Sequence, residues 1–293
     1  MQATPLRLQM CWGITLMHDP YIIAEIGSNC FRYDELAKNL ANAKEQIVRA
    51  REAGASAVKF QFFSAFELWG PKVRGTELQM EQDRYSMPFG WLPILKEQCA
   101  QHEIDFLCSG FSVSGFKGLA PYVKYHKLAS PELADPGIRK YLQRQPRPVI
   151  WSLGCRTPVQ LAGWYPNAKD VLLECVSDYP ADPCHYDLFN ARAFAAYQGH
   201  RWGLSDHTQF TWLARYARSY GASVFEKHVD FVGGGGRTPP DAVVSVDGKA
   251  FKAYADIVRS QPVLDHQELK KEPAERYGRR ETPDGWYRPL PEG

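Results

Sequence analysis

The chain has 293 residues, of which 44% are hydrophobic and 23% are charged, and its formal net charge is +2. Such a chain can bury an apolar core, so the composition excludes an intrinsically disordered protein. A net charge this close to zero argues against a nucleic acid or a membrane surface as the partner and favours a small molecule.

The cysteines and the N-terminal residues indicate the cellular compartment in which the protein is expected. The seven cysteines are odd in number and contain no CxxC pair, which is typical of small buried side chains in a reducing environment. The N-terminal residues lack the pattern of a secretory signal, and no run of ~18 apolar residues occurs anywhere. We therefore expect a cytoplasmic protein.

Strand-like and helix-like segments alternate regularly along the chain. Strands are expected at 21–26, 56–63, 104–109, 123–129, 147–153, 170–176, 201–206 and 222–229. Helices are expected at 34–53, 77–102, 112–120, 133–144, 157–164, 187–198, 209–220 and 247–260. The expected strands are mostly apolar, as in a parallel sheet that is covered on both faces. The pattern predicts a (β/α)8 TIM barrel.

The barrel is predicted to occupy residues 21–261, with a further segment at each end. Residues 1–20 contain a possible short hairpin over 6–17 that would plug the bottom of the barrel. Residues 262–293 lose the apolar periodicity and become rich in Pro, Arg and Glu, so we expect an irregular tail that either docks or is disordered.

Polar residues stand at the carboxyl ends of the expected strands, where barrel enzymes carry their catalytic groups. They are Glu25, Lys59, Gln61, Ser109, Lys127, Ser130, Ser152, Ser177, Asp206, His207, Glu226 and His228. One such residue would mark only the exit of a strand from the core. Because every strand delivers one to the same rim, we predict an active site there.

The residue types at the rim indicate an anion site. Two lysines, Lys59 and Lys127, together with the hydroxyls of Ser109, Ser130 and Ser152, would suit a compact dianion such as a phosphate ester.

The rim also carries candidate metal ligands. His207 and His228 end successive strands, each beside a carboxylate that could orient its ring, so they are candidates to bind one divalent cation. Glu25 is placed as a general acid or base. Glu226 either joins this site or pairs with Lys227, and both interpretations stay open.

The segment VGGGGRTPPD (232–241) follows the last expected strand. Four consecutive glycines give a loop with no single preferred backbone conformation, which would suit a lid over the rim. A plain linker is an equally good interpretation.

Seven motifs, in order along the chain, resemble those of the sialic acid synthase (N-acetylneuraminate synthase) family. They are IIAEIGSN (22–29), AGASAVKFQ (53–61), DFLCSGF (105–111), KLASPE (127–132), ECVSDYP (174–180), GLSDHT (203–208) and GASVFEKH (221–228). The resemblance implies a barrel that condenses phosphoenolpyruvate with an N-acetylated amino sugar resembling N-acetylmannosamine. The products would be a nonulosonic (sialic-type) acid and phosphate, and the cofactor Mn²⁺ or Mg²⁺.

The resemblance also implies roles for individual residues. Phosphoenolpyruvate would be bound by Lys59, Ser109, Lys127, Ser130, Ser152 and Ser177. The metal ligands would be His207 and His228, which count as catalytic together with Glu25 and Gln61 near the reacting carbons. The sugar would face Tyr179 and Asp241.

The chain departs from the family in several places. Fuller members carry a C-terminal antifreeze-like domain, swapped between the protomers of a dimer, whose arginine contacts the N-acyl group of the sugar. We expect the catalytic barrel alone here, and a homodimer is possible if the tail reaches a neighbouring copy. The tail offers Arg276, Arg279, Arg280 and Arg288 as substitutes for that arginine, unless it is simply a solvated basic segment. Pro131, Glu174 and Ala242 replace the usual Gly, His and His.

Two other functions remain open at this point. One is a different metal-dependent barrel enzyme, an aldolase or isomerase acting on a sugar phosphate, which would use the same lysines and histidines without consuming phosphoenolpyruvate. The other is a non-catalytic relative that binds a sugar.

Overall fold

A computed structural model describes residues 19–154, 164–260, 280–282 and 285–287. The predicted hairpin at 6–17 lies outside the described residues, and so does all but the last residue of the helix expected at 157–164. Within the predicted tail, β10 (Arg280–Thr282) and β11 (Gly285–Tyr287) pair in antiparallel fashion, although no regular structure was expected there.

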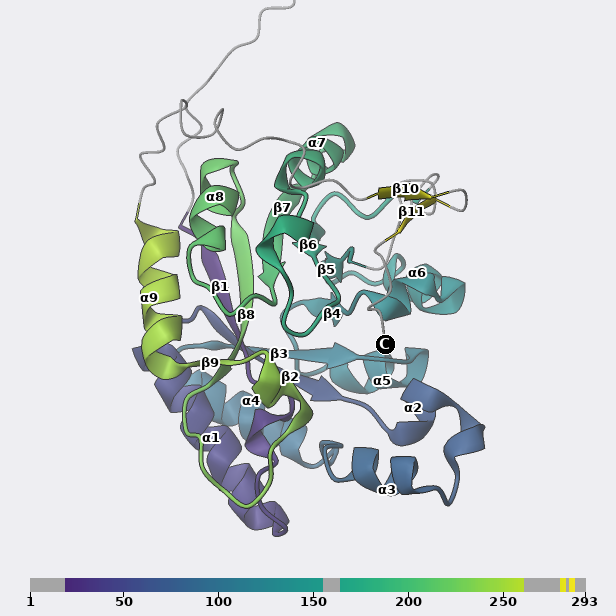
Figure 1. The fold of residues 1–293 in the computed structure, drawn as a ribbon. Helices are drawn as coiled ribbons and strands as arrows, with labels where there is room; N and C mark the ends of the chain where they lie inside the picture. Colours follow the sequence, from purple (N-terminus) through teal and green to yellow (C-terminus); the bar gives the residue numbers. More distant parts are fainter. Residues whose placement is uncertain (1–18, 155–163, 261–279, 283–284, 288–293) are drawn as a thin grey trace, which may run out of the picture.

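Eight parallel strands close into a ring, which confirms the predicted (β/α)8 barrel (Figure 1). The strands are β1 (Tyr21–Glu25), β2 (Ala57–Phe62), β3 (Asp105–Gly110), β4 (His126–Leu128), β5 (Val149–Ser152), β6 (Val171–Cys175), β7 (Arg201–Asp206) and β8 (Val224–Asp230). Each strand pairs with its neighbour in sequence, and β1 also pairs with β8. A two-residue strand, β9 (Val246–Asp247), extends the sheet beside β8.

Helices surround the ring of strands (Figure 1). The described ones are α1 (Leu36–Glu52), α2 (Ala65–Trp69), α3 (Glu77–Asp83), α4 (Trp91–Gln101), α5 (Val113–Leu119), α6 (Pro136–Leu142), α7 (Leu188–Gln198), α8 (Leu213–Ser219) and α9 (Gly248–Arg259). Helix α1 buries Ala43, Ile47 and Ala50 at helical spacing, and Gly54 follows its end with φ +92°. No described helix is long and apolar enough to cross a membrane.

One expected helix is wrong in its extent. The segment 77–102 forms two helices, α3 and α4, because Pro88 and Gly90 interrupt it. A proline disfavours helical backbone at the residue before it and donates no backbone hydrogen bond, so a continuous helix across this segment is unfavourable.

The apolar core has two layers. The larger layer lies between the strands and the helices and includes Ile22, Ala24, Val58 and Phe60. The smaller layer fills the inside of the ring with Ile23, Ala57, Leu107, Ile150, Val171, Leu173 and Val224. Alternate residues of a strand point to opposite faces, so the residue two positions after each of these also points inward.

Candidate active site

The inner face of the ring changes from apolar to polar along the strands. Two residues beyond Ile23, Ala57 and Leu107 stand Glu25, Lys59 and Ser109, and two residues beyond Ile150 and Val224 stand Ser152 and Glu226. Because every second residue of a strand points inward, the inner apolar layer is followed directly by a layer of buried polar side chains. Their exposed fractions are 5% or less. This gathering at the carboxyl ends is the arrangement that the sequence predicted.

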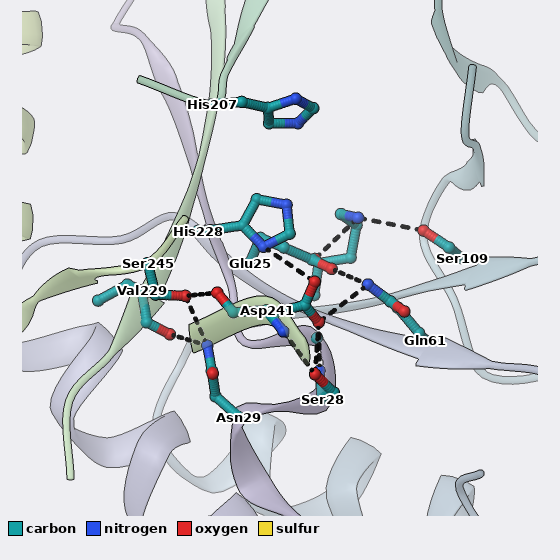
Figure 2. A network of polar contacts seen from close by, with 12 residues as sticks. Glu25, Ser28, Asn29, Gln61, Ser109, His207, His228, Val229, Asp241 and Ser245 are labelled. Carbon is teal, nitrogen blue, oxygen red and sulfur yellow. Dashed lines mark hydrogen bonds and ion pairs between the residues drawn. The ribbon is translucent and has the colours of Figure 1, made fainter. Parts of the chain in front are cut away.

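Glu25 and Lys59 form a buried ion pair on the neighbouring strands β1 and β2. Lys59 Nζ lies 2.7 Å from Glu25 Oε2 and donates to Ser109 Oγ at 3.1 Å. Gln61 Nε2 donates to Glu25 Oε1 at 3.1 Å (Figure 2). Burial raises the pKa of Glu25 to about 7 even though Lys59 opposes the shift. A carboxyl group with such a pKa can accept or release a proton near neutral pH.

Lys127, on β4, lies on the other side of the same interior. Its ammonium group donates to Ser152 Oγ at 2.7 Å and lies 3.6 Å from Glu226 Oε1. Burial lowers the pKa of Lys127, while Glu226 acts in the opposite direction. Lys59 Nζ is also 3.6 Å from Glu226, at Oε2, so one carboxylate bridges the two lysines. The structure thus brings the predicted anion-binding groups together.

The alternative pairing of Glu226 with Lys227 is wrong. Consecutive strand residues face opposite ways, and Lys227 points outward, where its ammonium lies 3.2 Å from Asp206 and donates to the carbonyl of Thr208 at 2.8 Å. Glu226 points inward and accepts from Ser205 Oγ at 2.8 Å. Burial alone would raise the pKa of Glu226, but Lys127 and Lys59 hold it down at about 2, so it is ionised.

His207 and His228 face one another, with ring centroids 5.3 Å apart (Figure 2). Tyr179 stacks on His207 at 4.4 Å and meets His228 edge-on at 5.9 Å. Burial lowers the pKa of both histidines, and for His228 the charge of a protonated His207 would lower it further. Both rings are therefore neutral at pH 7, the state in which imidazole binds metals.

The carboxylate expected to orient His207 is placed differently from the prediction. Asp206 pairs with Lys227 on the outer face, so it does not orient His207. Nδ1 of His207 instead lies 2.5 Å from the carbonyl oxygen of Val176. A carbonyl only accepts, so Nδ1 carries the proton and Nε2 of His207 keeps its lone pair.

His207 and His228 offer two imidazole nitrogens to a divalent metal. Among the described residues, no group of three or more His, Cys, Asp or Glu side chains is arranged to hold an ion. The protein would thus supply two nitrogen ligands through His207 and His228, and water or substrate oxygens would complete the coordination. Nε2 of His207, with Ser205 Oγ 3.4 Å away, is the nitrogen that would bind the metal.

Two more of the predicted hydroxyls gather at Gly154, just after β5. Ser130 Oγ accepts from the backbone N–H of Gly154 at 3.0 Å. A Cβ on Gly154 would lie 2.9 Å from Ser177 Oγ and 3.0 Å from Ser130 Oγ. Glycine is therefore required for the chain to pass this close to both side chains.

Asp241 reaches the site from the 3-10 helix at Pro240–Val243, beyond β8. Its Oδ2 accepts from the backbone N–H of Ser28 at 2.6 Å, from Ser28 Oγ at 2.8 Å and from Gln61 Nε2 at 3.3 Å. Its Oδ1 lies 3.6 Å from His228 Nδ1. Asp241 thus joins the site, but its observed partners are protein groups.

Three residues of this site were missed as site residues or left undecided. Glu226 lies two residues before His228, and Ser205 lies two residues before His207. Residues two apart in a strand point to the same face, so the sequence could have indicated that both side chains face inward. Ser28 carried no such signal, since its partner Asp241 is 213 residues away.

Comparisons with known proteins show which family the chain resembles. A model of the NeuB family matches residues 46–268. A pseudaminic acid synthase of Helicobacter pylori is 28% identical over 267 residues, which cover 85% of this chain and 76% of that protein. An N,N'-diacetyllegionaminic acid synthase of Legionella pneumophila is 28% identical over 281 residues, covering 85% of this chain and 74% of that protein.

A solved structure supports the fold. The N-acetylneuraminic acid synthetase of Leptospira borgpetersenii, in complex with citrate, superposes with a TM-score of 0.70 at 22% identity. The superposition covers 86% of this chain and 90% of the other. The resemblance noted in the sequence is confirmed: the chain belongs to the NeuB family.

Proposed function

We propose that the protein condenses phosphoenolpyruvate with an N-acetylated amino sugar and releases a nonulosonic acid and inorganic phosphate. Membership of the NeuB family supports this proposal, as do relatives that are named as synthases of pseudaminic and legionaminic acids.

The observation that carries the proposal is the pair of buried lysines around Glu226. Two ammonium groups from β2 and β4 lie 3.6 Å from the same carboxylate, and each also contacts a serine hydroxyl. A small dianion that enters this site could bind the ammonium groups of Lys59 and Lys127 through charge-assisted hydrogen bonds. Phosphoenolpyruvate, with its phosphate and carboxylate groups, is an anion of suitable size and charge.

The residues support a divalent cation on His207 and His228, either Mn²⁺ or Mg²⁺. When bound, the ion would polarise the aldehyde oxygen of the sugar. The ring of Tyr179 is half exposed beside the two histidines, so it could contact the sugar that arrives there. Asp241 would then be a polar contact for the same substrate.

The proposed reaction makes one carbon–carbon bond and, at C2, replaces the bond to the phosphate oxygen with a bond to the oxygen of water. C3 of phosphoenolpyruvate attacks the aldehyde carbon of the sugar, and water adds at C2. Phosphate then leaves by cleavage of the C2–O bond, and C2 becomes the ketone of the product. Glu25, whose pKa is about 7, would take the proton from the attacking water. Gln61 would hold the carboxyl group of Glu25 through the bond at 3.1 Å.

The direct test offers phosphoenolpyruvate with a panel of amino sugars and measures released phosphate with and without Mn²⁺. We expect phosphate release that needs both a sugar and the metal. Turnover of a sugar phosphate without phosphoenolpyruvate would instead identify another barrel aldolase or isomerase. Sugar binding without any turnover would identify a non-catalytic relative.

A further inference from the structure

The backbone turn after β1 and the 3-10 helix after β8 are joined through one carboxylate. Asp241 Oδ2 accepts from both the backbone N–H and the hydroxyl of Ser28, and the backbone N–H of Asp241 donates back to Ser28 Oγ at 3.1 Å. Ser28 is only 4% exposed, and its hydroxyl both donates to Asp241 Oδ2 and accepts from the backbone N–H of Asp241. Two of the three bonds hold Oδ2, to which Gln61 Nε2 also donates at 3.3 Å, and the third ties the backbone of Asp241 to the same serine.

The neighbouring residue Gly27 makes this close approach possible. Its φ is +52°, and a Cβ at that position would lie 2.2 Å from Asp241 Oδ2. A side chain at residue 27 would therefore displace the carboxylate, and the positive φ would be strained for most other residues. The turn is built to receive the carboxylate of Asp241.

The second oxygen of the same carboxylate points to His228. Asp241 Oδ1 lies 3.6 Å from His228 Nδ1, and Figure 2 shows the two groups facing each other. Nδ1 of His228 is buried and has no hydrogen-bond partner among the described residues. A small closure of this gap would give a hydrogen bond that leaves Nε2 of His228 free.

We propose that Ser28 is a positioning residue that acts through Asp241 on His228. By holding Oδ2, Ser28 turns Oδ1 towards Nδ1 of His228, which keeps the proton on Nδ1 and the lone pair on Nε2. The ring is then oriented in advance for a divalent cation shared with His207. This inference rests on the proposed function, because that function makes His228 a metal ligand.

The test measures Mn²⁺ binding without substrates, by titration with detection of free Mn²⁺ by electron paramagnetic resonance. Asp241→Asn is expected to weaken binding by ~10- to 100-fold, the range for outer partners of metal-ligating histidines. Ser28→Ala is expected to weaken it by about tenfold, because the backbone N–H of Ser28 still holds Oδ2. In the Asp241→Asn background, Ser28→Ala should cost less than about twofold, since its effect is transmitted through Asp241.

Ser245→Ala is the matched control. Ser245 Oγ donates to the backbone carbonyl of Asp241 at 2.7 Å, so this variant loosens the same junction without touching the carboxylate. It should bind Mn²⁺ like the wild type. If Ser28→Ala does not fold, Ser28→Thr and Ser28→Val provide a pair of nearly equal shape that differs in the hydroxyl, and only the valine variant should bind weakly.

The outcomes separate this inference from the proposed function. A wild-type protein that binds no Mn²⁺ would remove the metal from the proposed function and the inference with it. A wild-type protein that binds Mn²⁺, with Ser28→Ala or Ser28→Val binding equally well, would overturn the positioning role alone. Equal losses for Ser28→Ala and Ser245→Ala would also overturn it, because they would indicate general loosening.

Discussion

Glu226 on β8 lies 3.6 Å from the ammonium group of Lys127 on β4, across the interior of the ring. These strands are separated by three others in either direction, so the contact spans the barrel. Buried ion pairs of this kind add little net stability, because desolvation offsets most of the attraction. Stability alone therefore does not account for these ion pairs, and the proposed function gives the two lysines a role as anion-binding groups.

Replacing Lys127 with Met should raise the KM for phosphoenolpyruvate by about tenfold or more, or abolish turnover, because a charge-assisted contact is lost. Steady-state phosphate release at varied phosphoenolpyruvate measures this. Lys124→Met is a matched control, since Lys124 is half exposed and pairs with Asp105 away from the site. Normal saturation by phosphoenolpyruvate in Lys127→Met would refute the anion site.

Glu25→Gln should fold normally and slow turnover by ~10²-fold or more, because an amide cannot take a proton from water. Since the pKa of Glu25 is about 7, the wild-type kcat should fall as the pH drops below that value and the carboxylate becomes protonated. The variant should lose this limb of the pH profile. Glu45→Gln, on the exposed face of α1, is the control. A Glu25→Gln enzyme at full speed would exclude proton transfer by this residue.

Chelation should abolish activity, and added Mn²⁺ should restore it, because two histidines alone hold a divalent ion weakly. His207→Asn should demand a higher Mn²⁺ concentration for half-maximal phosphate release. His102→Asn, at the end of α4, should not change this requirement. Activity that survives an excess of chelator would remove the metal from the mechanism.

His126 predicts a pH-dependent stability unrelated to catalysis. Its ring is 1% exposed, meets the edge of Phe116, and has no hydrogen-bond partner at either nitrogen among the described residues. Burial lowers its pKa to about 4. Between pH 6.5 and about 4 the unfolded chain therefore binds more protons than the folded protein, so acid lowers the free energy of unfolding.

From pH 8 to pH 5 this histidine should cost about 2 kcal/mol of stability. Replacement by Leu removes the titrating group, so His126→Leu should lose less stability over the same range. Urea unfolding at the two pH values provides the measurement. The same loss in both proteins would show that other groups govern the acid sensitivity.

Much of the barrel was predictable from the sequence, because strand and helix periods are local properties. The eight strands were found to within a few residues, with the largest error at β4, where the expected run 123–129 shortens to His126–Leu128. The helix expected at 77–102 is divided for an equally local reason, because Pro88 and Gly90 lie between α3 and α4.

Only part of the site was predictable from the sequence. The alternation of side chains along each strand and the family motifs indicate which residues lie in the site. Parity alone separates Glu226, which faces inward with His228, from Lys227, and applying it would have settled the pairing left open in the sequence. The contact of Ser28 with Asp241 depends on how two distant loops meet. Because the periodic pattern of a sequence contains no information about such a contact, only the structure could identify it.

The pairing of β1 with β8 also has a consequence for synthesis of the protein. Glu25 is made early, whereas its partners on β8 and Asp241 are made in the last quarter of the chain. A nascent chain that does not yet include β8 cannot close the ring. Since domains generally fold as units during synthesis, enzymatic competence should arise only after nearly all of the barrel has emerged.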